Sequence, residues 1–136
     1  MGAWDSDPFG NDSACDWIYQ LETVNDLSLI ENTLKAVIEV GGEYLESFEA
    51  EQAVAAVDTI ARLKGNFYVK NPSTETLDKW VESNNFEINS ELIDLSVKVL
   101  DRIQTAPSEL LELWEESDEF SNWKKHLEDL KIRISS

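Results

Sequence analysis

Positive charge is scarce in this sequence of 136 residues, which has eleven Lys and Arg against 28 Asp and Glu, for a formal net charge of −17. The scarcity is greatest in residues 1–61, where Lys35 is the only Lys or Arg beside thirteen acids. Nucleic acids and anionic membranes attract clustered Lys and Arg, so we expect neither kind of partner. A field of one sign is typical of a protein that gains solubility from it or binds a partner of opposite charge.

Cysteine, glycine and long apolar runs are also scarce. Cys15 is the only cysteine, which excludes an intrachain disulfide and favours a reducing, cytoplasmic location. No apolar run approaches the roughly 20 residues that a membrane-spanning helix needs, and the N-terminus lacks the basic and apolar regions of a secretory signal. Met1 and Gly2 open a loose myristoylation pattern, but no basic patch supplies the second membrane signal. The five glycines form no phosphate-binding loop.

Histidine is limited to His126, which any Ser-His or Cys-His catalytic site would have to use. Cys15 is a poor partner for it, because the neighbouring Asp12 and Asp16 disfavour a thiolate. One His and one Cys are too few for a zinc site, and Trp123 stands where a Glu-x-x-His di-iron motif needs Glu. We therefore expect a surface histidine, a half-buried thiol and no catalytic residue.

A calcium site is the remaining metal hypothesis, since residues 5–10 imitate the opening of an EF-hand loop. However, Phe9 occupies the fifth position and Asp16 the twelfth, where a bidentate Glu is needed. We expect no metal and no cofactor. Paired carboxylates abound, but none is singled out by an apolar setting, so a carboxylate-dependent enzyme stays only as an alternative.

The sequence is rich in apolar and aromatic residues, with 42% apolar residues and five Trp, which is too much for a disordered acidic chain. Apolar residues recur at helical spacing. They predict helices over residues 12–21, 26–40, 47–64 and 90–104. A short helix is expected between Ser73 and Asn84, another after Ser108, and the last one after Ser117. Gly41-Gly42 and Gly65 are expected to end two of them, because glycine accepts a left-handed conformation. The predicted fold is one all-α domain of six to seven helices, bundle-like, with residues 1–11 as an irregular arm and the tryptophans as core.

Acidic residues gather in three places. Asp5 and Asp7 lie in the arm and are further candidates for partner binding, and six acids fall between Glu109 and Glu119. The third group comprises Glu39, Glu43, Glu46, Glu49 and Glu51 around the double glycine. Negative charge near a helix C-terminus is unfavourable, so Glu39 and Glu43 need a reason other than helix stability. With the interleaved aromatic residues Tyr44 and Phe48, this group is the predicted partner-binding patch, because aromatic anchors ringed by charge resemble an interface hot spot. Either ring could equally belong to the core.

Several segments resemble a bacterial family known as domain of unknown function 4259. They are Met1-Gly2-Ala3-Trp4, Pro8-Phe9, Asn11-Asp12, Asp16-Trp17, Tyr44-Leu45-Glu46, the alanine-rich stretch 51–61 and Ser108 to Glu116. Asp5-Ser6-Asp7 stands where the family tends to have Gly-x-Gly. The resemblance covers essentially the whole chain and implies an intracellular bacterial protein, but it carries no known activity and assigns no catalytic residue.

These observations favour a non-catalytic, acidic protein-binding domain whose partner has a basic surface. In its sharpest form it would be an immunity protein that inhibits a cationic toxin domain, for example a nuclease. The alternative is a stand-alone structural or regulatory helical protein that can self-associate and whose acidity only aids solubility.

Overall fold

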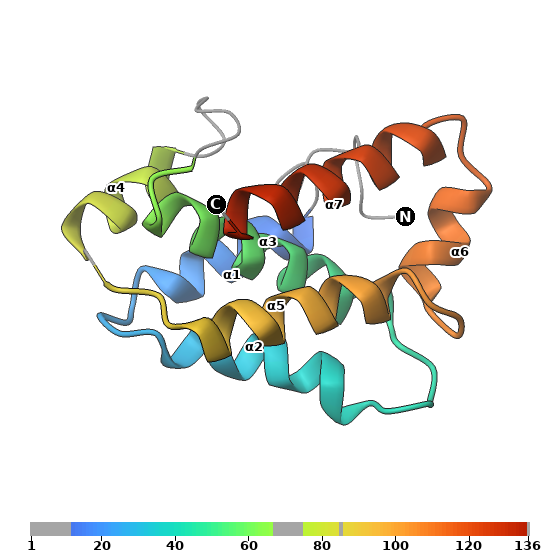
Figure 1. The fold of residues 1–136 in the computed structure, drawn as a ribbon, viewed down its shortest axis with the longest axis horizontal. Coiled ribbons are helices and arrows are strands. Elements are labelled where there is room, and N and C mark those ends of the chain that lie inside the picture. The colour runs from blue at the N-terminus through green and yellow to red at the C-terminus, as the bar shows by residue number, and fades with distance from the viewer. Residues whose placement is uncertain (1–11, 67–74, 85, 136) are drawn as a thin grey trace.

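The fold is all-α, as predicted, in a computed structural model that describes residues 12–66, 75–84 and 86–135 (Figure 1). These residues form seven helices and no strand. The helices are α1 (Asp12–Leu21), α2 (Ser28–Glu39), α3 (Ser47–Leu63), α4 (Glu75–Ser83), α5 (Ser90–Ile103), α6 (Glu109–Glu115) and α7 (Phe120–Ser135). The arm of residues 1–11, with Trp4, lies outside the described residues.

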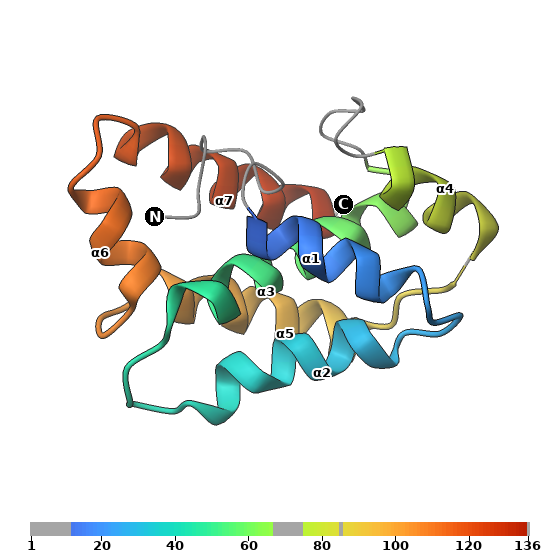
Figure 2. The ribbon, with the colours of Figure 1, turned by 180° about the vertical axis from the view of Figure 1, so that it is seen from behind.

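The long helix α3 is the centre of the fold and packs against α1, α2, α4, α5, α6 and α7. From Ala50 to Arg62 every residue except Gln52 is buried. Five alanines in this stretch have side chains small enough to let the surrounding helices approach closely. Figures 1 and 2 show the result, in which α3 runs through the middle of the molecule with helices on all sides.

The predicted helix faces form the core. Ala14, Trp17, Ile18 and Leu21 of α1 are all buried, and Trp123, Leu127, Leu130 and Ile134 of α7 are buried too. Trp80 and Trp114 are likewise in the core, so the four described tryptophans confirm the prediction. Buried tryptophans need a partner for the indole N–H. Trp17 donates to Thr33 Oγ1 at 2.8 Å and Trp80 to the Val24 carbonyl at 2.9 Å.

The predicted helix ends are also confirmed at the glycines. Gly41 follows α2 with φ +62° and Gly65 follows α3 with φ +86°, in the left-handed region where a Cβ is strained. Not every apolar residue at helical spacing is buried, since Ile38 at the end of α2 is 38% exposed. The cap of α5 was not foreseen: Asn89 accepts a hydrogen bond from the Leu92 N–H at 2.8 Å.

The molecule has two opposite ends along its long axis. Helix α4 lies at one end, and α6 lies at the other together with the 40–46 connection between α2 and α3 (Figures 1 and 2). The acidic patch predicted from the sequence therefore falls at the α6 end.

Candidate functional site

The connection between α2 and α3 is joined to the residues that precede α6. The Leu45 N–H donates to the Pro107 carbonyl at 3.2 Å, and the Glu109 N–H donates to the Leu45 carbonyl at 2.9 Å. These bonds form an isolated parallel bridge between Leu45 and Ser108, both of which are buried. The bridge brings the second and third acidic groups of the sequence side by side.

The side chain of Glu109 also links α6 to the first residue of helix α3. Its Oε1 accepts a hydrogen bond from the Ser47 N–H at 2.8 Å, whereas Glu46, at the N-cap position of α3, makes no side-chain capping bond. A carboxylate beside free N–H groups at a helix start is stabilising, both as an acceptor and through the helix dipole. Thus α3 is capped by a side chain from α6, 62 residues further along the chain.

Tyr44 is the aromatic residue at the centre of the junction. It is 48% exposed, and its hydroxyl donates to Glu112 Oε2 at 2.7 Å. This hydrogen bond, with smaller contributions from partial burial and the charges of Glu112, Glu109 and Glu46, raises the pKa of Tyr44 to about 12. The ring is therefore held in one orientation while half of it faces solvent.

We call this surface the acidic corner, comprising Glu39, Glu43, Tyr44, Glu46, Phe48, Glu49, Glu109 and Glu112. Phe48, in the first turn of α3, is also 48% exposed, so neither aromatic ring is core. Glu39, Glu43, Glu46 and Glu112 are exposed, and Glu49 and Glu109 are partly so. In the part of the chain that the structure describes, none of the ion pairs involves a carboxylate of this corner.

One residue predicted for the patch is misplaced. Glu51 is only 5% exposed, and it lies in the stretch of α3 from Ala50 to Arg62 in which every residue except Gln52 is buried. It cannot be part of an exposed partner surface. Asp5 and Asp7, the other predicted candidates outside this group, lie outside the described residues.

A buried charge network that was not predicted lies at the other end of the molecule. Asp58 Oδ1 accepts from Arg62 Nε at 3.3 Å and from Arg133 Nη1 at 3.0 Å. Arg62 also contacts Asp78 of α4, and Arg133 contacts Asp129 at 2.8 Å. The Asp58–Arg62 spacing of four residues was a readable signal, but Arg133 lies 75 residues away from Asp58. The network ties α3, α4 and α7 together.

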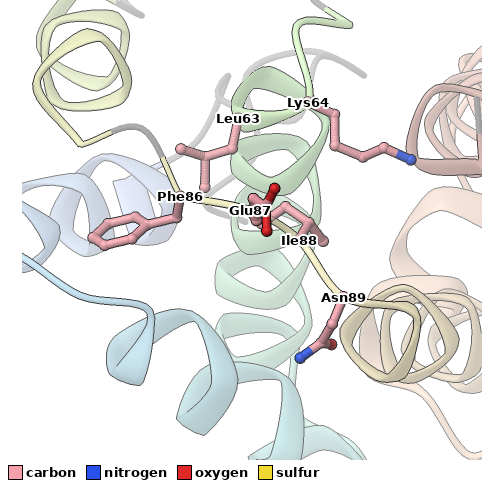
Figure 3. Close-up of a pocket in the computed structure, with 6 residues that line it drawn as sticks. All are labelled: Leu63, Lys64, Phe86, Glu87, Ile88 and Asn89. Carbon is pink, nitrogen blue, oxygen red and sulfur yellow. The ribbon is translucent and has the colours of Figure 1, made fainter.

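A shallow cleft of about 850 Å³ lies between the end of α3 and the segment leading into α5. Leu63, Lys64, Phe86, Glu87, Ile88 and Asn89 line it (Figure 3). Its polar groups are largely engaged, because Lys64 Nζ donates to the Ile134 carbonyl at 2.5 Å and Asn89 caps α5. Figure 3 shows Lys64 reaching toward α7 while Phe86 points the opposite way, so the cleft does not focus side chains on one point.

The described ranges also bear on metals and membranes. Within residues 12–66, 75–84 and 86–135, no group of three or more His, Cys, Asp or Glu residues is placed to hold a metal ion. None of the helices in these ranges has the length and apolarity required to cross a bilayer. Cys15 and His126 are both partly buried, so the half-buried thiol is confirmed and the histidine is less exposed than expected.

Fold and surface together define a small all-α domain with an acidic, aromatic corner at one end. The chain belongs to the family described as Domain of unknown function (DUF4259), whose sequence model matches residues 2–126. This match confirms the resemblance and covers essentially the whole chain. Neither a curated protein nor a solved structure matches the chain.

Proposed function

We propose that this protein is a non-catalytic binding domain whose acidic corner docks against a basic surface of a protein partner. The observation that carries the proposal is the position of Tyr44 and Phe48, two half-exposed aromatic rings set among carboxylates from two acidic runs. Large exposed aromatic residues are enriched among the residues that dominate binding energy. Surrounding charge of one sign steers a partner of the opposite sign and speeds association.

The absence of these carboxylates from the ion pairs of the described chain supports the same proposal. Each basic residue that forms an ion pair does so elsewhere, mainly with Asp58, Asp78, Asp101 and Asp129. The corner thus retains its negative potential for an external cation. In the specific form of the proposal, the partner is a cationic toxin domain, such as a nuclease, and docking blocks its active surface.

The test is binding to the product of the adjacent gene, measured at about 50 and 150 mM NaCl, over which screening of exposed charges increases. The test variant is E43Q/E46Q/E49Q. Its matched control, E22Q/E82Q/E87Q, removes the same number of charges from residues outside the corner. We expect the corner variant to bind at least about 10-fold more weakly with a smaller salt dependence, and the control to change by less than about 2-fold.

The aromatic anchors need their own variants, F48A and Y44A, which leave the charge unchanged. We expect each to weaken binding by about 10-fold or more, chiefly through faster dissociation. If the corner variant and its control lost affinity equally, then only the net charge of the protein would matter for binding. Unaltered affinity in F48A and Y44A would contradict docking at this corner.

A further inference from the structure

Arg102, in the last turn of α5, makes an unusual set of contacts at the acidic corner. Its guanidinium donates to the carbonyls of Gly41 at 3.0 Å, Glu43 at 2.6 Å, Thr105 at 2.8 Å and Pro107 at 3.0 Å. Two of these acceptors belong to the connection between α2 and α3, and two belong to the segment between α5 and α6. One side chain therefore fastens the two segments that form the corner.

The acceptors are backbone carbonyls and not carboxylates, although carboxylates are abundant nearby. No ion pair of the described residues involves Arg102. An arginine paired with Glu43 or Glu112 would cancel part of the negative potential of the corner. Bound to carbonyls, Arg102 instead fixes the backbone and forms no ion pair with the carboxylates, although its positive charge still lowers the negative potential nearby.

The two segments need such a fastening because they repel each other. Glu46 from one segment and Glu109 and Glu112 from the other all act electrostatically on Tyr44, so carboxylates of both segments lie close together beside the Leu45–Ser108 bridge. Like charges at close range destabilise a contact, and the bridge itself contributes only two backbone hydrogen bonds. Two side-chain bonds, Ser47 N–H to Glu109 and Tyr44 hydroxyl to Glu112, add to these. Arg102 adds two more between the segments, to the carbonyls of Gly41 and Glu43, while its bonds to Thr105 and Pro107 hold it to its own side. All four bonds of the guanidinium are assisted by its charge, and such bonds are stronger than neutral ones.

From this geometry we infer that Arg102 is the positioning residue of the acidic corner: it holds the segment 41–47 against α6 in the conformation that presents Tyr44 to a cationic protein partner. This inference rests on the proposed function. Preorganising a binding surface improves affinity because less conformational freedom is lost on binding. Lysine cannot replace arginine here, because a single ammonium lacks the planar fork that reaches four carbonyls in two segments.

The first arm of the test needs no partner and compares the wild type with R102K and R102Q by amide hydrogen exchange. The reporters are the N–H groups of Leu45, Ser47 and Glu109, each of which bonds across the junction. The Leu92 N–H, capped by Asn89 away from the corner, is the control. We expect R102Q to speed exchange at the three reporters by at least about 10-fold and R102K by a smaller factor, with Leu92 unchanged, since local opening need not involve global unfolding.

The second arm uses a nona-arginine peptide as the cationic probe, with affinity measured by calorimetry and the contact site mapped by NMR chemical shifts. R102Q removes a positive charge, so an electrostatic role alone predicts tighter binding of the peptide. A positioning role predicts weaker binding, by about 3- to 10-fold, because the corner must be ordered at the expense of binding energy. R102K keeps the charge and should bind more weakly than the wild type as well.

The two arms separate the failure of this inference from the failure of the proposed function. Unaltered exchange at Leu45, Ser47 and Glu109 in R102Q would overturn the positioning role, and so would faster exchange with unchanged or tighter peptide binding. If the peptide causes no chemical-shift changes at the wild-type corner, the proposal that this corner docks a cationic partner is wrong. The inference about Arg102 is then wrong as well, even if the exchange data show that Arg102 orders the segment.

Discussion

The two ends of the molecule use arginine and carboxylates in opposite ways. At the α4 end, Asp58 is fully buried between Arg62 and Arg133, and these two arginines form ion pairs with three carboxylates, those of Asp58, Asp78 and Asp129. At the α6 end, Arg102 binds only carbonyls, and the carboxylates around it face solvent. The first arrangement joins three helices from within, whereas the second joins two surface segments through their backbone carbonyls. Under the proposed function, carboxylates of one chain therefore serve stability at the α4 end and recognition at the α6 end.

The strongest way to test this contrast is to neutralise the buried carboxylate. We expect D58N to lower the free energy of unfolding by about 3–5 kcal/mol, because it leaves two buried guanidinium groups with less countercharge. Urea unfolding followed by tryptophan fluorescence measures the loss. The control is E75Q, which breaks the exposed Lys79–Glu75 pair and should change stability by less than about 1 kcal/mol. If D58N lowered the free energy of unfolding as little as E75Q does, the buried charge network would not stabilise the α4 end.

Glu109 allows a test of intermediate size, because it is the one carboxylate of the corner that caps another helix. E109A should lower the free energy of unfolding by about 1 kcal/mol, the usual cost of losing an N-terminal cap. E109Q should lose less, since its amide oxygen can still accept the Ser47 N–H. Urea unfolding of both variants separates the hydrogen bond from the charge, and a more stable E109A would show that repulsion outweighs the cap.

How far the sequence predicted these features depends on how local each one is. Helix positions and the four described core tryptophans follow from spacing within single segments, and glycine chemistry predicted the ends at Gly41 and Gly65. Glu51 was misjudged, because its burial depends on tertiary packing that the pattern within one segment does not show. The cap of α3 by Glu109 joins residues 62 apart in the chain, and no pattern within one segment encodes it.

Neutralising the solvent-facing carboxylates should have a small effect of the opposite sign to that of D58N. We expect E43Q/E46Q/E49Q to leave the free energy of unfolding unchanged or to raise it by up to about 1 kcal/mol, because it relieves like-charge repulsion. Stability in this variant should also respond less to added salt than in the wild type, since less repulsion remains to be screened. Urea unfolding at about 20 and 500 mM NaCl measures both effects. A clear destabilisation would mean that these carboxylates support the fold, as those at the α4 end do.

The smallest effect concerns the proton on Tyr44, whose pKa is raised to about 12 mainly by its hydrogen bond to Glu112. The neutral phenol is the hydrogen-bond donor, so the folded protein holds this proton more tightly than the unfolded chain, in which tyrosine titrates near 10. The stabilisation is thus fully present below about pH 10 and declines as the pH rises toward 12.

The measurement is the tyrosinate absorbance of the wild type minus that of Y44F as a function of pH. We expect this difference to titrate with a pKa of about 12. In E112Q, which keeps the acceptor shape but removes the charge, the same difference should move toward 10. If the difference titrates near 10 in the wild type already, then the Tyr44–Glu112 bond does not persist in solution, and Tyr44 is less firmly held than the rest of the acidic corner.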